Sequence, residues 1–161
     1  MRQIWAPWRM AYIRRDEKTS ACVLCRSWAS DDDAESYILY RGERAYIMLN
    51  LYPYNNGHLM VVPYEHVASL EDLETETLTE LMVLVNRSLA ALREAMAPHG
   101  FNIGVNLGRA AGAGIREHVH IHIVPRWEGD TNFMPLLGQT RVIPEMLEDT
   151  YARLLVAIQE G

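Results

Sequence analysis

The segment His118–Val124 constrains this chain most strongly, because histidine alternates in it with branched apolar residues. An alternation of period two is typical of a β-strand, whose successive side chains point to opposite faces. We expect Val119, Ile121 and Ile123 to face a core and the three imidazoles to line the other face. Imidazole is the side chain most easily poised near neutral pH as a base, nucleophile or metal ligand. We therefore predict an active site here, in preference to polar residues on a merely solvated strand.

The length and charge of the chain limit its class. A chain of 161 residues is long enough for one domain with its own core. Its 15 basic and 21 acidic residues give a net charge of −6, which argues against a general nucleic-acid binder. No apolar run approaches the roughly 20 residues that span a bilayer, and the N-terminal sequence lacks the apolar core of a signal peptide. We expect a cytoplasmic protein with no membrane partner.

Two kinds of periodicity predict the secondary structure. Besides residues 118–124, four segments have the composition or alternation of strands: 37–40, 45–50, 58–62 and 101–107. Apolar residues spaced by three and four predict a long helix over 75–96, with a capping box at Thr77–Glu80, and a final helix over 145–159. Strands that do not alternate with helices favour an α+β fold with a mainly antiparallel sheet. The loop 108–114 should join an antiparallel pair.

Cys22 and Cys25 are the only cysteines and form a C-x-x-C motif. In a reducing compartment such a pair is seldom a structural disulfide. A thioredoxin-like motif normally begins a helix within a βαβ unit, which the acidic stretch over 27–35 does not resemble. The motif therefore predicts half of a zinc site that needs two further ligands.

The spacing of the three alternating histidines limits how many of them can bind one zinc ion. Strand residues i and i+4 lie ~13 Å apart, whereas zinc ligands sit about 2.0–2.3 Å from the ion. One ion is therefore not expected to bind all three imidazoles. We expect one outer imidazole to join the cysteines and the other two to perform chemistry.

Two imidazoles beside a glycine-rich loop suit chemistry at phosphorus. A neutral imidazole attacks phosphorus to form a phosphoramidate that is later cleaved easily. Its other ring nitrogen should donate to a carbonyl, which fixes the tautomer. The second imidazole can donate to a phosphate oxygen, and backbone N–H groups of the loop 108–114 can cradle the anion. Arg109 adds positive charge, and His58 on another strand is a further candidate donor.

The segment His118–Val124 resembles the His-φ-His-φ-His-φ-φ signature of the HIT (histidine triad) superfamily of nucleotide hydrolases and transferases. Residues 5–12, 50–63 and 122–133 look like its bacterial diadenosine tetraphosphate phosphorylase or hydrolase branch. The resemblance implies an α+β HIT-like domain with a five-stranded, mainly antiparallel sheet, one long central helix and a C-terminal helix. It also implies a homodimer with a shared sheet. We expect a single HIT domain over 1–161, with an N-terminal arm (1–20), a zinc-binding segment (21–35) and a catalytic body (36–161).

The resemblance also assigns roles residue by residue. It implies that His120 is the nucleophile that attacks the α-phosphorus of an adenine nucleotide, forming a nucleotidyl-histidine, and that His122 and His58 assist at the phosphates. The implied nucleotide-binding residues are Met48 and Leu51 near the base, Asn50 at the ribose, Asn106 near the phosphates, and Gly112, Gly114 and Ile115 in the loop. The loop lacks the side-chain donors of many relatives, so its phosphate contacts should be mainly backbone. The implied ligands of a structural zinc ion are Cys22, Cys25, His66 and His118.

Two other functions use the same residues. One is hydrolysis of an AMP phosphoramidate or another adenylate conjugate, which would employ the same His120 chemistry. The other is nucleotide binding without significant turnover. The sequence leaves open whether water or inorganic phosphate is the acceptor.

Overall fold

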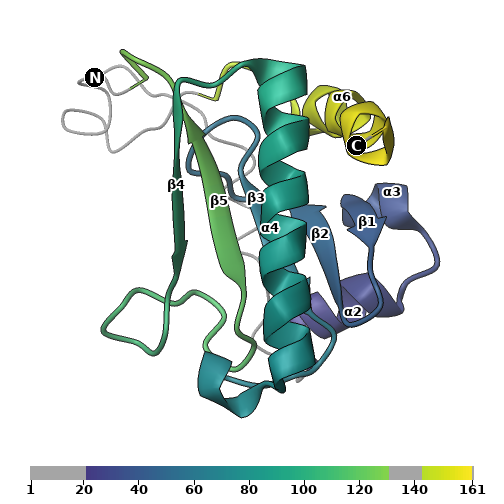
Figure 1. The fold of residues 1–161 in the computed structure, drawn as a ribbon, viewed down its shortest axis with the longest axis vertical. Coiled ribbons are helices and arrows are strands. Elements are labelled where there is room, and N and C mark those ends of the chain that lie inside the picture. The colour runs from purple at the N-terminus through teal and green to yellow at the C-terminus, as the bar shows by residue number, and fades with distance from the viewer. Residues whose placement is uncertain (1–20, 131–142, 161) are drawn as a thin grey trace, which may run out of the picture.

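The computed structural model describes residues 21–130 and 143–160, so the predicted N-terminal arm and residues 131–133 lie outside the described residues. A five-stranded antiparallel sheet forms the centre, in the order β1-β2-β3-β5-β4 (Figure 1). The strands are β1 (Ile38–Arg41), β2 (Ala45–Leu49), β3 (Leu59–Pro63), β4 (Gly100–Val105) and β5 (Ile121–Arg126). The predicted α+β class and the antiparallel pairing of the strands on either side of loop 108–114 are confirmed.

Helices cover the sheet from two sides. They are α2 (Val23–Ala29), α3 (Asp33–Ser36), the 3₁₀ turn η1 (Leu70–Asp72), α4 (Thr75–Met96) and α6 (Leu147–Glu160). The long helix α4 crosses one face of the sheet and packs beside α6 (Figure 1). Its predicted bounds are confirmed, and the final helix begins two residues later than the predicted residue 145. No helix within the described ranges is long and apolar enough to cross a membrane.

The predicted capping box is wrong, because Thr77 and Glu80 lie inside α4 and not at its start. Thr77 Oγ1 donates to the Glu65 carboxylate at 3.0 Å. The Glu80 carboxylate accepts the backbone N–H of Arg44, with N–O distances of 3.0 and 3.1 Å. Glu80 thus links the turn between β1 and β2 to helix α4. This is a tertiary contact and not the capping contact that the Thr77–Glu80 spacing suggests.

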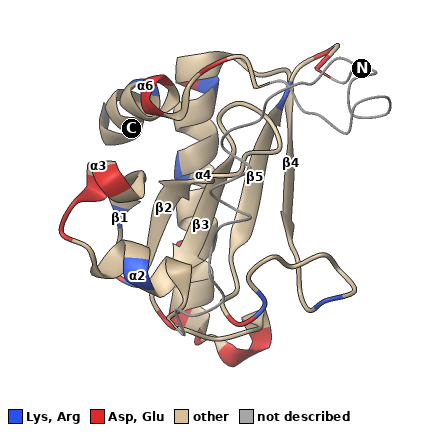
Figure 2. Ribbon diagram, turned by 180° about the vertical axis from the view of Figure 1, so that it is seen from behind, with Lys and Arg blue, Asp and Glu red and all other residues tan. Residues whose placement is uncertain are grey.

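Strand alternation divides the apolar residues between two clusters. Val119, Ile121 and Ile123 belong to the larger cluster, which packs against α4 and α6, as the sequence predicts. The smaller cluster on the other face comprises Leu24, Ile38, Tyr46, Met48, Met60 and Val62. Helix α2 contributes Leu24 to it, and α2 lies on this side of the sheet (Figure 2).

The register of the sheet places one histidine within a continuous row of residues. Ile38 pairs with Met48, Met48 with Met60, and Met60 with His122. On its other flank His122 pairs with Gly104 of β4. Among the described residues, a Cβ atom at Gly104 would meet nothing within 4 Å. His122 is therefore flanked by an apolar surface on one side and by open space on the other.

The histidine strand is shorter than predicted, because β5 begins at Ile121 and residues 118–120 precede it. At the N-terminal end of β5, pairing with both neighbouring strands stops at Ile121. Beyond it, Pro63 at the end of β3 has no N–H to donate to a ladder. The backbone N–H of Val119 donates instead to the carbonyl of Val67 at 2.7 Å. His118 and His120 therefore lie in a segment outside the sheet ladder.

Candidate active site and metal cluster

The buried His58 and the half-buried His122 form a hydrogen-bonded pair on the second face of the sheet. The backbone N–H of Tyr54 donates to His58 Nδ1 at 3.0 Å, so the neutral His58 ring carries its proton on Nε2. His58 Nε2 lies 3.0 Å from His122 Nδ1 and donates to it. The proton of His122 is therefore on Nε2, the nitrogen that does not face His58. Asn50 Nδ2 lies 3.4 Å from His58 Nδ1, so the two residues adjoin.

His120 has the opposite tautomer. Its Nδ1 lies 2.9 Å from the carbonyl oxygen of His118, which can only accept, so Nδ1 carries the proton. Nε2 then holds a lone pair. The ring is buried and lies edge-on to that of His122, with centroids 4.7 Å apart. The site thus presents one imidazole acceptor, on His120, beside one imidazole donor, on His122.

Electrostatics favour the neutral form of both rings. Burial lowers the pKa of His120, and its hydrogen bond to the His118 carbonyl opposes this in part. Burial, together with the nearby His120, lowers the pKa of His122 to about 4. A nucleophilic nitrogen must be unprotonated, so this environment suits covalent catalysis at neutral pH.

The remaining predicted nucleotide-binding residues lie around this face. Met48 is buried in the smaller cluster, and Ile115 packs against that cluster. The Asn50 side chain accepts the backbone N–H of Tyr52 at 2.9 Å, and Leu51 and Asn106 are half-buried just beyond the ends of β2 and β4. Gly112, with φ of +82°, and Gly114 lie on the loop before the histidines.

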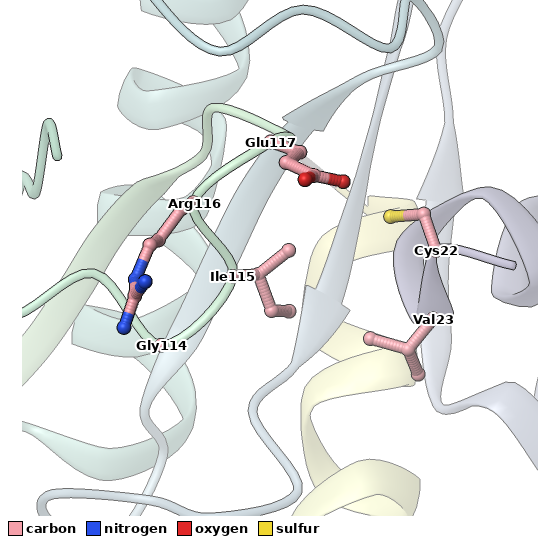
Figure 3. Close-up of a pocket in the computed structure, with 6 residues that line it drawn as sticks. All are labelled: Cys22, Val23, Gly114, Ile115, Arg116 and Glu117. Atoms are coloured by element: carbon pink, nitrogen blue, oxygen red, sulfur yellow. The ribbon is translucent and has the colours of Figure 1, made fainter. Parts of the chain in front are cut away.

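A cavity of about 350 Å³ separates this loop from the start of α2 (Figure 3). In the close-up, Ile115 points toward Val23 across the cavity, whereas Arg116 points away from Val23. The lining residues are Cys22, Val23, Gly114, Ile115, Arg116 and Glu117. Val23, Arg116 and Glu117 are not among the residues predicted from the sequence to form a site. No periodicity marks them, because their proximity results from the packing of α2 on the sheet.

The two cysteines meet two histidines at the end of β3. Cys22 Sγ and Cys25 Sγ each lie 3.4 Å from His118 Nδ1, and Cys25 Sγ lies 3.2 Å from His66 Nδ1. The four ligand atoms all lie within 4.8 Å of one another. Tetrahedral zinc with N and S ligands requires ligand separations of roughly 3.3–3.8 Å. The donor set therefore fits a zinc ion, and the three sulfur–nitrogen distances of 3.2–3.4 Å are close to those of a tetrahedral site.

The orientation of His118 also suits a metal ligand. Its Nε2–H donates to the Pro63 carbonyl at 2.8 Å, which directs the lone pair of Nδ1 toward the sulfur atoms. Burial and the neighbouring Cys22 raise the pKa of the Cys25 thiol. Binding of a cation would then release a proton from this thiol.

The expectation that the two cysteines do not begin a helix is wrong. Cys22 is the N-cap of α2 and Cys25 lies in its first turn, so the C-x-x-C motif does begin a helix, as in a thioredoxin-like site. The acidic stretch after residue 27 concealed this short helix. The proximity of His66 and His118 distinguishes the site from a dithiol pair that stands alone.

Comparison with known proteins identifies the family. The HIT domain matches residues 32–129, which is more than half of the chain. The chain belongs to the HIT family. This HIT protein is 43% identical over 157 residues to the AP-4-A phosphorylase of Mycobacterium tuberculosis, covering 93% of this chain and 80% of that one. It is 31% identical over 107 residues to an adenosine 5′-monophosphoramidase of Saccharomyces cerevisiae, covering 66% of this chain and 63% of that one.

A solved structure supports the same assignment. The fold matches that of a Zn-bound histidine triad family protein from Mycobacterium smegmatis with a TM-score of 0.70 and 30% sequence identity. The match covers 87% of this chain and 94% of the other. The family predicted from the histidine motif is therefore confirmed.

Proposed function

We propose that this HIT protein cleaves dinucleoside polyphosphates of the diadenosine tetraphosphate type at the α-phosphorus. The observation that carries this proposal is the pair of opposite tautomers, with an acceptor on His120 Nε2 beside a donor on His122 Nε2. The 43% identity to an AP-4-A phosphorylase supports the substrate class.

The proposed reaction has two displacement steps. His120 Nε2 attacks the α-phosphorus, a P–N bond forms, and the P–O bond to the leaving nucleotide breaks. The His118 carbonyl stabilises the positive charge that develops on the His120 ring, through the Nδ1–H bond. His122 donates from Nε2 to a phosphate oxygen, while His58 holds its ring in place. Water or inorganic phosphate then attacks the nucleotidyl-histidine, and His120 departs as a neutral ring.

The nucleotide is proposed to lie along the second face of the sheet. Met48 and Leu51 would contact the base and Asn50 the ribose. Asn106 and the backbone of Gly112, Gly114 and Ile115 would contact the phosphates. Arg109 and Arg116 are exposed basic residues of the same loop, and they would supply positive charge locally in a chain of net charge −6.

Cys22, Cys25, His66 and His118 are proposed to hold a structural zinc ion. A four-coordinate zinc ion would cross-link the start of α2 to the segments that follow β3 and precede β5. All four positions would be filled by protein, so the ion would offer no open site to substrate. The zinc-bound relative from M. smegmatis supports the choice of metal.

We infer a single HIT domain over the chain, with residues 21–35 as the zinc-binding segment and residues 36–161 as the catalytic body.

We also infer a homodimer that shares its sheet through β4. This strand is at the edge of the sheet, where Ile103 is 47% exposed and the following Leu107 is 40% exposed. An apolar edge strand with unpaired backbone groups favours addition of a second sheet.

Product analysis tests the proposed function. Diadenosine tetraphosphate should give ADP and ATP when inorganic phosphate is the acceptor, and AMP and ATP when water is. His120→Ala should abolish turnover while AMP still binds, whereas His99→Ala should retain it, because His99 lies outside the site and accepts a hydrogen bond from Glu128. If an AMP phosphoramidate is cleaved with much higher kcat/KM, the monophosphoramidase-like function is correct instead.

A further inference from the structure

One aromatic side chain packs against the imidazole pair and also reaches the surface. The ring centroid of Tyr54 lies 4.8 Å from that of His58 and 5.9 Å from that of His122, with interplanar angles of 36° and 34°. His58 is fully buried, whereas Tyr54 is 48% exposed. The Tyr54 ring therefore lies against the inner imidazole and presents part of its own surface to solvent at the rim of the site.

The loop that carries Tyr54 is held from two sides by side-chain hydrogen bonds. Asn55 Nδ2 donates to the Asp130 carboxylate, which follows β5, at 2.9 Å. Asn56 Nδ2 donates to the Glu145 carboxylate, which precedes α6, also at 2.9 Å. These bonds fix the two residues directly after Tyr54. An aromatic ring on a loop fixed in this way can contact a ligand with little loss of conformational entropy.

An exposed hydrophobic side chain does not by itself indicate a ligand, because single exposed hydrophobic residues are normal on protein surfaces. The position of Tyr54 sets it apart. Within the described ranges, the other large hydrophobic residues that are strongly exposed are all non-aromatic: Met82, Val83, Ile103, Leu107, Met146 and Val156. Tyr54 is the aromatic member of this group, and its ring lies against the imidazoles of the candidate active site.

The direction of the proposed reaction brings the leaving group toward this rim. In phosphoryl transfer the attacking and leaving atoms lie roughly in line, on opposite sides of phosphorus. The proposed attacking atom is Nε2 of His120, whose ring is buried. The leaving nucleotide therefore departs away from this ring, toward the exposed side of the site. Tyr54 is exposed and borders His122, the proposed donor to a phosphate oxygen.

We propose that Tyr54 is a specificity-determining residue whose exposed ring face stacks against the base of the leaving nucleotide. Every nucleobase has a π-face, so stacking on an aromatic side chain tolerates any base. The single bonds of the polyphosphate let this base turn back onto a ring beside the reacting phosphorus. The site would then favour a leaving group that ends in a nucleoside over one without a base. This inference rests on the proposed attack of His120 on a dinucleoside polyphosphate.

Two substrates that share an AMP half and differ in the leaving group test the proposal. Diadenosine tetraphosphate releases a nucleotide with a base, whereas AMP phosphoramidate releases ammonia. In Tyr54→Leu, kcat/KM for diadenosine tetraphosphate should fall about 5- to 150-fold, the factor that stacking of one base contributes. The value for AMP phosphoramidate should change by less than about threefold. Tyr54→Phe should retain both activities, and Met82→Ala, an exposed change on α4, is the control.

The same substrate pair separates stacking from support of the imidazoles. Tyr54→Leu keeps an apolar side chain next to His58 and keeps the backbone N–H that donates to His58 Nδ1. Equal losses for the two substrates would mean that Tyr54 acts through His58, and this result overturns the proposal. Unchanged kcat/KM for diadenosine tetraphosphate in Tyr54→Leu overturns it as well.

Binding gives a readout that does not depend on turnover. In a His120→Ala background, Tyr54→Leu should weaken the binding of diadenosine tetraphosphate about 5-fold or more and the binding of AMP little, as measured by titration calorimetry. Equal effects on both ligands contradict the stacking contact. This comparison decides the contact whichever substrates the wild type cleaves. If the wild type cleaves neither substrate, the proposed function fails on its own.

Discussion

Substitution of His58 by Gln or by Asn can separate the hydrogen bond that its ring accepts from Tyr54 from the one that it donates to His122. His58 is fully buried, its Nδ1 accepts from Tyr54, and its Nε2 donates to His122. A Gln amide places an N–H group near the position of Nε2 and can still donate to His122. An Asn oxygen lies near the position of Nδ1 and can still accept from Tyr54. The pair therefore tests which bond catalysis requires.

The structure gives the expected size of the effect. A buried polar group left unsatisfied costs about 1–3 kcal/mol. Each variant loses one of the two bonds, so both should unfold at lower urea concentration, by about that free energy. Only His58→Asn leaves His122 Nδ1 unsatisfied and its tautomer unfixed. If the same 1–3 kcal/mol is lost from the transition state, kcat should fall about 5- to 150-fold in His58→Asn.

Steady-state turnover of diadenosine tetraphosphate and urea unfolding measure the two effects. His58→Gln should retain most of the activity despite its lower stability. Equal activity of the two variants, or greater activity of His58→Asn, would refute the assignment of the His122 proton to Nε2.

Three further predictions concern stability and assembly. The pKa of His122 is about 4 in the folded protein against an ordinary 6.5, so the unfolded state binds its proton first as the pH falls. As the pH falls from 6.5 to 4, the free energy of unfolding should therefore drop by about 1.4 kcal/mol per pH unit. Urea titrations of His122→Gln over the same pH range should lack this pH-dependent loss of stability. Glu80→Ala should cost about 1–3 kcal/mol by releasing the turn between β1 and β2, whereas the exposed Glu94→Ala should change the melting temperature little. Ile103→Lys should shift sedimentation toward the monomer, and Val156→Lys, an exposed substitution on α6, should not; a dimer that persists in Ile103→Lys contradicts assembly through β4.

Local patterns in the sequence predict the elements that local physics determines. The period of three and four over Thr75–Met96 gives the bounds of α4, because one helix face is buried along its whole length. The alternation at Val119, Ile121 and Ile123 gives the buried face of the catalytic strand. It does not reveal where pairing stops, since that depends on Pro63 in a different strand and on the Val119–Val67 bond.

The chemistry of the site divides in the same way. Strand geometry predicts that one outer imidazole of the three is a metal ligand. Only the family resemblance specifies His118 and His66. The carbonyl that fixes the tautomer was expected from the chemistry of a nucleophilic imidazole, and His118 supplies it. The helix that begins at Cys22 escaped prediction because a seven-residue helix followed by acidic residues gives almost no periodic signal.

Gly104 leaves open space beside His122 on the β4 side of the site. It faces His122 across the β4–β5 pair, and no atom of the described part of the chain occupies the space where its side chain would project. The space beside His122 on this flank is thus left open because the neighbouring strand carries no side chain there. If the leaving group of the proposed reaction lies on this flank, we expect residues of increasing bulk at position 104 to restrict its size in steps while the proposed catalytic imidazoles stay unchanged.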